Sequence, residues 1–134
     1  KKNDHDCIIF SRYIVGGLDK RSFYRSFSSL LINKLCQIFL FSKIKDYTSC
    51  IIIFKKQVLV EVFPKNTYYA NFIIDFIFEL LQKNKNVKEI AFTQDKYTEE
   101  NSKSAPNMIK FFFNGLLYLF SILRCSFIKL LRIK

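Results

Sequence analysis

The short stretch "NDHDC", near the start of the chain, contains residue types that bind metal ions. His5 stands between Asp4 and Asp6 and is followed by Cys7, so imidazole, carboxylate and thiol groups are adjacent. Zinc sites are usually built from paired Cys or His residues on separate segments, and this chain has no CxxC pair and no second His. Four neighbours near a chain end are poorly placed to surround one ion. We therefore expect no metal and no other cofactor.

The carboxylates Asp75 and Glu79 are one helical turn apart, so both could act as a general acid and base on one helix face. They also continue the polar stripe of a largely apolar helix, and Glu79 precedes Lys83 by four residues, which is the spacing of an ordinary surface ion pair. No Ser or Cys has a His partner other than His5. Gly16-Gly17 matches neither glycine-rich phosphate-binding pattern. We predict that the chain is not an enzyme.

The four cysteines show no pattern typical of a site. Cys7, Cys36, Cys50 and Cys125 are separated by 29, 14 and 75 positions. Such irregular spacing is typical of buried, reduced thiols. A disulfide or a metal ligand is the alternative interpretation.

The cations near the end of the chain fall on one side of a predicted helix. At 100° per residue from Lys110, six polar residues share an arc of roughly 140°: Asn114, Ser121, Arg124, Cys125, Lys129 and Arg132. We expect this helix to present Arg124, Lys129 and Arg132 and to bury its apolar residues, namely Phe112, Phe113, Leu116, Leu119, Phe120 and Leu123. Two alternatives stay open: the cations solvate an exposed face, or they dock on a membrane surface.

The same segment raises the question of a membrane span. Only 13 residues, "FFFNGLLYLFSIL", lie between Lys110 and Arg124. A span needs about 20 largely apolar residues. The other apolar runs are interrupted by charges such as Lys34 and Asp75, which would be costly at the centre of a bilayer. We therefore expect no membrane partner.

Composition limits the class of protein. With 134 residues the chain has the size of one domain, and 22 Lys and Arg against 11 acidic residues give a net charge of +11. Such an excess favours a polyanionic partner. Lys, Ile, Phe, Asn and Tyr, all encoded by A/T-rich codons, make up 66 of the 134 residues. This bias indicates an A/T-rich genome, most often that of an organelle.

The apolar periodicity predicts a small α+β domain. Residues 1–20 are expected to form an N-terminal arm with a turn at Gly16-Gly17, and residues 21–134 a single domain. The predicted elements are a helix over 21–41, a hairpin of strands 51–54 and 58–63 ended by Pro64, a helix from Asn66 or Thr67 to Lys83, a strand over 86–92, a polar loop over 93–107 and a last helix from Phe111. The fold expected is a small sheet, a hairpin plus one strand, packed with helices.

Three stretches resemble one family, the KH-type small-subunit ribosomal protein three, in a divergent organellar form. The stretch "RCSFIKLLR" resembles the motif of its last helix, "GGLDKRSFYRSF" resembles a segment before its first helix, and "SCIIIFKKQVLVEVFP" resembles its strand–turn–strand. The resemblance covers most of residues 10–134 and implies a KH type II-like fold. The family has a cation where this chain has Ile128, and a GxxG loop where this chain has "KNTYYANF".

The resemblance implies a structural constituent of the mitochondrial small ribosomal subunit, in the matrix, that binds ribosomal RNA near the messenger RNA entry region. Another A/T-rich organelle is the alternative location. Further implied partners are messenger RNA, neighbouring proteins of the small-subunit head and a separate chain carrying the missing C-terminal lobe. From the charges we expect these RNA contacts: Arg21, Arg25, Lys55, Lys56, Arg124, Lys129 and Arg132. The alternative function is an accessory, non-catalytic subunit of an organellar membrane complex.

Overall fold

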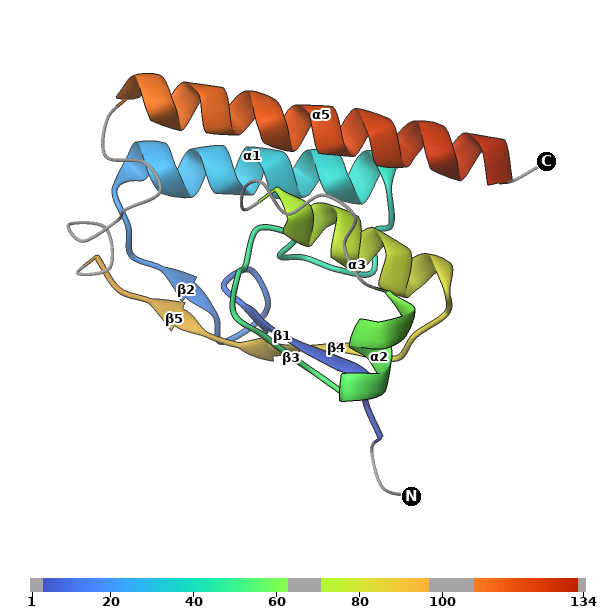
Figure 1. Ribbon diagram of the computed structural model, residues 1–134. Coiled ribbons are helices and arrows are strands. Elements are labelled where there is room, and N and C mark those ends of the chain that lie inside the picture. The colour runs from blue at the N-terminus through green and yellow to red at the C-terminus, as the bar shows by residue number, and fades with distance from the viewer. Residues whose placement is uncertain (1–3, 63–70, 97–107, 133–134) are drawn as a thin grey trace.

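The computed structural model describes residues 4–62, 71–96 and 108–132, and within them the chain is an α+β fold (Figure 1). It contains four helices, a mixed three-strand sheet and a two-strand parallel sheet. In chain order the elements are β1 (Cys7–Ser11), β2 (Leu18–Asp19), α1 (Phe23–Phe39), β3 (Ile52–Phe54), α2 (Lys56–Glu61), α3 (Phe72–Gln82), β4 (Val87–Ala91), β5 (Thr93–Gln94) and α5 (Met108–Arg132). The predicted α+β class is confirmed.

The central strand of the main sheet comes from the segment that we expected to be an arm. The strand order is β3-β1-β4. β1 pairs antiparallel with β3, with Cys7 opposite Phe54, and parallel with β4, with Cys7 opposite Val87 and Ser11 opposite Ala91. Cys7 and Ser11 are buried because both neighbours of β1 are strands and its inner face is covered. The arm prediction was therefore wrong for this segment.

The predicted hairpin is absent because its second strand is helical. Lys56–Glu61 forms α2, and β3 pairs with β1 instead. Val58 and Val62, four residues apart, are both buried, so the β-branched run satisfies a helical spacing against the core. Burial has outweighed the strand preference of Val here, as strand propensity depends strongly on context. The predicted strand end at Phe63 and Pro64 lies outside the described residues.

Of the remaining elements, the helices and the strand agree with the predictions over the described residues, whereas the predicted loop begins with a strand. The predicted helices over 21–41 and up to Lys83 are α1 and α3, and the predicted strand over 86–92 is β4. The start predicted at Asn66 or Thr67 lies outside the described residues, as does most of the loop over 93–107. The first residues of that loop are β5, which pairs with β2 in parallel, Leu18 opposite Thr93. The turn predicted at Gly16-Gly17 is present, with φ +86° at Gly16 and a hydrogen bond from the Gly17 N–H to the Ile14 carbonyl.

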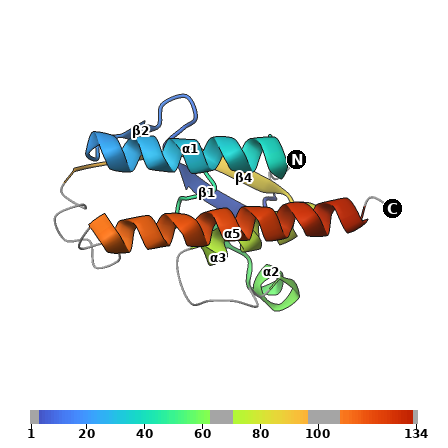
Figure 2. The ribbon, with the colours of Figure 1, turned by 90° about the horizontal axis from the view of Figure 1, so that it is seen from above.

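Helices α1, α3 and α5 form two layers over one face of the sheet, and α2 lies beside the sheet. Figure 1 shows α1 and α3 next to the sheet and α5 farthest from it. Seen from above, α1 and α5 run side by side in the same direction, and α5 also crosses over α3 (Figure 2). The core lies between the sheet and the helices and includes Ile9, Cys36, Tyr47, Ile77 and Ile122.

Candidate functional site

The side of α5 that faces the domain is polar. Asn114, Ser121 and Cys125 are buried there. The Asn71 side-chain amide, at the start of α3, donates a hydrogen bond to the Ser121 hydroxyl at 2.8 Å. The predicted clustering of these polar residues on one arc is confirmed, but the arc lies against the domain.

Asp75 on α3 holds α5 through two neighbouring residues. Its Oδ2 lies 2.6 Å from Nη2 of Arg124, and its Oδ1 accepts a hydrogen bond from the Cys125 thiol at 3.1 Å. Burial, together with the Asp75 hydrogen bond, raises the pKa of Cys125 well above its ordinary value. The charge of Arg124 is therefore used inside the molecule, where it offsets a nearly buried carboxylate.

Lys129 is also directed inward. Its ammonium group donates to the Leu40 carbonyl and lies 4.7 Å from the centre of the Phe41 ring. Our expectation that α5 presents Arg124 and Lys129 outward was wrong. Periodicity shows which residues share a helix face, but not which face meets the protein, and here the polar arc has partners on α3 and after α1.

The outward side of α5 is apolar, so the expected burial of its large side chains was wrong. Phe112, Phe120 and Leu123 are 65%, 66% and 65% exposed. The other exposed apolar residues of α5 are Ile109, Phe113, Leu116, Leu117, Leu119, Phe127, Leu130 and Leu131. They recur at intervals of three and four along the helix, which places them on one broad face.

The neighbouring helix α1 extends this apolar surface. Phe23 is 82% exposed and Ile38 is 72% exposed, and Phe27, Leu30 and Leu31 are exposed between them. The buried residues of α1, among them Ile32 and Cys36, lie on the opposite side of the helix. We refer to the exposed apolar residues of α1 and α5 together as the α1–α5 face. It lies opposite the buried residues of these two helices, which Figure 2 shows from the side away from the sheet.

Residues Ile109–Leu131 of α5 are long and apolar enough, by length and composition, to cross a membrane, and little of this stretch is buried. This helix is longer than the 13-residue run on which the sequence argument relied. Length and composition do not establish a membrane span by themselves, since the core helix of a soluble protein can have the same properties.

The other predicted RNA-binding residues lie in two further places. Arg21, just before α1, pairs with Asp19 at 2.7 Å, and Arg25 lies over the rings of Tyr24 and Phe111. Lys55, just before α2, pairs with Asp4 at 2.6 Å and with Asp6 at 3.2 Å.

Lys56, the first residue of α2, is exposed. Arg132 is the last residue of α5, and its side chain lies outside the described part of the chain. The seven predicted residues therefore do not converge on one surface, since they belong to the start of α1, the start of α2 and the second half of α5.

Sequence reasoning missed a buried ion pair between Arg12 and Asp46. Arg12 follows β1 and is 5% exposed, and Asp46, in the loop after α1, is fully buried. The Arg12 Nε and Nη2 atoms donate to the two Asp46 carboxylate oxygens, each at 2.8 Å, and the Arg12 backbone N–H donates to the same carboxylate at 3.0 Å. This bidentate geometry is the strongest form of such a pair, and it fastens the α1–β3 loop to the sheet.

Neighbouring groups complete the hydrogen bonds of this pair. Arg12 also donates to Gln94 and Thr48, at 2.9 and 2.7 Å. The amide of Asn33 on α1 donates to Asp46 Oδ1 and accepts from the Tyr47 N–H. Each of these polar atoms has a hydrogen-bond partner, as a buried network requires. The network therefore has a structural role: it links the α1–β3 loop to the end of β1.

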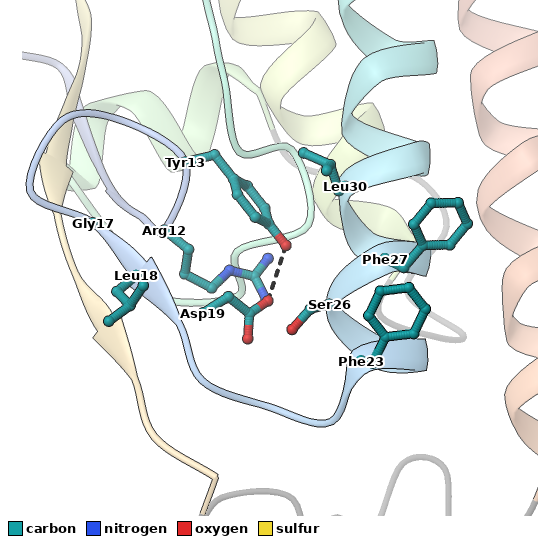
Figure 3. A pocket seen from close by; sticks show the side chains of 9 residues that line it. All are labelled: Arg12, Tyr13, Gly17, Leu18, Asp19, Phe23, Ser26, Phe27 and Leu30. Carbon is teal, nitrogen blue, oxygen red and sulfur yellow. Dashed lines mark hydrogen bonds and ion pairs between the residues drawn. The ribbon is translucent and has the colours of Figure 1, made fainter.

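A pocket of about 330 Å³ opens beside this network, between the turn after β1 and the start of α1 (Figure 3). Its floor contains Arg12 and Asp19, and its rim includes the exposed Phe23, Phe27 and Leu30. The Tyr13 hydroxyl donates to Asp19 at 2.9 Å, as the dashed line in Figure 3 marks.

The charged groups of this pocket are already balanced. Burial raises the pKa of Tyr13 to about 12, so its hydroxyl stays protonated. Burial alone would raise the pKa of Asp19, but hydrogen bonds and the charge of Arg21 outweigh it and hold that pKa well below its ordinary value. Because Arg12 and Arg21 match Asp46 and Asp19, the pocket offers no acid or base poised near neutral pH.

The predictions about metal and cysteine can be compared with the described residues. Among them, no three His, Cys, Asp or Glu residues are grouped so as to hold a metal ion. The four cysteines are free thiols: Cys7, Cys36 and Cys125 are buried, and Cys50 is exposed. The predicted burial is confirmed for Cys7, Cys36 and Cys125 and is wrong for Cys50.

The acidic residues are largely used inside the molecule. Seven of those in the described ranges form ion pairs with Lys or Arg: Asp4, Asp6, Asp19, Asp46, Glu61, Asp75 and Asp95. Glu89 accepts hydrogen bonds from the backbone N–H groups of Lys45 and Asp46. The negative charges therefore do little to offset the exposed lysines.

Four exposed lysines lie on the sheet and in segments next to it: Lys88 on its outer face, Lys56 at the start of α2, and Lys43 and Lys45 in the loop after α1. We call Lys43, Lys45, Lys56 and Lys88 the sheet-side lysines; none of them has an ion pair with another described residue. Lys88 is opposite Ile8 in the sheet, so its side chain points away from the helices, as does that of Ile53. Lys43 and Lys45 lie in the loop that Glu89 fastens to β4.

Comparison with models of known protein families finds no match, and comparison with curated proteins finds none either.

Proposed function

We propose that this chain is a non-catalytic, structural constituent of an organellar small ribosomal subunit, in the mitochondrial matrix, where it binds ribosomal RNA. The observation that carries the proposal is the charge distribution. The net charge is +11, and most described carboxylates are paired internally, so the surplus positive charge lies on exposed lysines. Such a surface suits a phosphate backbone, which dominates affinity in protein–RNA contacts.

The sheet-side lysines are the best candidates for these contacts. Lysines contact phosphates as point charges and fix position without reading sequence. Of the predicted set, Lys56 is retained on these grounds, whereas Arg124, Lys129 and Arg21 already have intramolecular partners. Lys43, Lys45 and Lys88 are additions that the sequence pattern did not single out.

The likeness to the KH-type family belongs to this proposal. It is supported by a small sheet with helices over one face and by the exposed sheet-side lysines. The hairpin expected from the family is replaced by β3 and α2. The position expected for a GxxG loop, after Pro64, lies outside the described residues. Neighbouring head proteins, messenger RNA and a separate C-terminal lobe are the partners that the proposal implies.

A second candidate function is favoured by the α1–α5 face. An accessory subunit of an organellar membrane complex would cover such a surface with lipid or with a membrane neighbour. Exposed apolar patches on single domains usually mark interaction sites. This candidate does not account for the sheet-side lysines, and we therefore place it second.

Ultraviolet cross-linking of the full chain in intact organelles tests the first candidate. We expect cross-links to small-subunit ribosomal RNA, with modified peptides that contain Lys43, Lys45 or Lys88, because those side chains are exposed on the sheet side. Peptides that contain Arg124 or Lys129 should be free of RNA, since these two cations of α5 face inward, and they serve as the internal control. Absence of ribosomal RNA from the cross-linked fraction would contradict the proposal.

A further inference from the structure

The two helices of the α1–α5 face contain no carboxylate. Their sequences, "FYRSFSSLLINKLCQIF" and "MIKFFFNGLLYLFSILRCSFIKLLR", include no Asp or Glu but carry Arg25, Lys34 and Lys110, besides Arg124 and Lys129, which face the domain. All 11 acidic residues of the chain lie in other segments. The partner that complements a surface that is apolar, flanked by cations and free of acids is itself apolar and carries negative charge.

The apolar stripe runs along nearly all of α5. Exposed apolar residues begin at Ile109 and reach Leu131, a distance of roughly 33 Å at 1.5 Å per residue. α1 lies alongside and adds a second stripe from Phe23 to Ile38 (Figure 2). In both helices the stripe lies opposite the buried residues, so both stripes can contact one flat surface at the same time.

The contacts of α5 favour an orientation in the plane of such a surface. Its polar side is fastened to α3 through Asp75–Arg124 and Asn71–Ser121, and Lys129 reaches the Leu40 carbonyl after α1. A spanning orientation would remove Arg124 from Asp75, which is nearly buried, and would leave both charges without compensation. An in-plane orientation keeps every one of these contacts.

We propose that the α1–α5 face docks in the plane of a lipid bilayer that contains anionic phospholipid. Phe and Leu side chains enter the boundary between headgroups and acyl chains, and Lys34, at the exposed side of α1, contacts the phosphates. A second copy of the chain is a poorer occupant, because two cationic, acid-free faces repel each other. RNA is also poorer, because a leucine-rich face offers it few cations.

This inference does not depend on the ribosomal proposal. The lipid-binding face and the sheet-side lysines have no residue in common, so each can be changed while the other is intact.

The full chain is synthesised in vitro in the presence of vesicles and then floated through a density gradient. Vesicles of phosphatidylcholine mixed equally with phosphatidylglycerol are compared with vesicles of phosphatidylcholine alone. We expect the chain to float with the anionic vesicles and much less with the neutral ones. Lys34→Gln should weaken the anionic binding by about fivefold, as expected for one lysine at such a surface.

The decisive variant is Phe120→Asp with Leu123→Asp. Both side chains are about two-thirds exposed, so the fold, checked by circular dichroism, should be kept while vesicle binding falls by about a hundredfold. Ile53→Asp is the matched control, because Ile53 is similarly exposed, at 58%, but lies on the sheet side. It should float like the original chain.

Three results would overturn the inference. The original chain stays at the bottom of the gradient with anionic vesicles; the double Asp variant floats as well as the original; or the bound chain resists alkaline carbonate extraction, which would mean that α5 crosses the bilayer.

Discussion

Replacing Arg12 with Met is expected to lower the free energy of unfolding by about 3–5 kcal/mol, the cost of removing one partner from a buried ion pair. Asp46 would keep its charge in a fully buried position, with only the Asn33 amide, Thr48 and the Arg12 backbone N–H as donors. The α1–β3 loop would lose its main attachment to β1. Urea denaturation, followed by circular dichroism, measures the change.

Two further variants identify the cause of the loss. Lys20→Met breaks an exposed pair with Asp95 at 3.1 Å, whose side chains are 52% and 63% exposed, and should change stability by less than about 1 kcal/mol. Arg12→Met combined with Asp46→Leu removes both charges and should regain part of the stability lost in the single variant. A loss below about 1 kcal/mol in Arg12→Met would show that the pair does not hold the loop.

Binding of the chain to a transcript of organellar small-subunit ribosomal RNA is expected to weaken steeply with salt. If the four sheet-side lysines each contact a phosphate, affinity should fall about a hundredfold between roughly 50 and 200 mM salt, because each contact releases about one counterion. The double variant Lys43→Gln with Lys45→Gln should reduce the slope of log affinity against log salt by about two. Fluorescence anisotropy over a salt series measures both quantities.

The matched control removes the same charge from the helices α1 and α5. Lys34→Gln with Lys110→Gln changes two exposed lysines of α1 and α5, and it should leave the slope nearly unchanged. An equal loss of slope in the two double variants would mean that RNA responds only to net charge. The assignment of the sheet-side lysines as contacts would then be wrong.

Periodicity along the sequence predicted the helices better than it predicted the sheet. The spacing of apolar residues placed α1, α3 and β4 because each pattern is local. β1 was missed because its apolar run is only a few residues long and its partner β4 follows about 80 residues later, with Cys7 opposite Val87. No sequence feature close to β1 predicts that pairing. The apolar run from Val58 to Val62 is compatible with a strand and with a helix, and its packing against the core determines which of the two forms.

The orientation of α5 could not be predicted from its own sequence. Its polar and apolar sides were identified correctly, but the side that meets the domain depends on Asp75 and Asn71, which lie on another helix. The same holds for Arg12 and Asp46, which are 34 residues apart and lie in segments that carry no motif. The one local signal for Arg12 was a cation placed directly after an apolar strand, and a buried cation there implies a carboxylate partner.

Sedimentation of detergent-lysed organelles through a sucrose gradient tests the ribosomal proposal most directly. Detergent removes lipid, so binding through the α1–α5 face cannot carry the chain into a fraction. At low salt the chain should migrate with the small ribosomal subunit and its RNA, and treatment with ribonuclease should return it to the top of the gradient. A chain that stays at the top at low salt, while other small-subunit proteins sediment, would contradict the account.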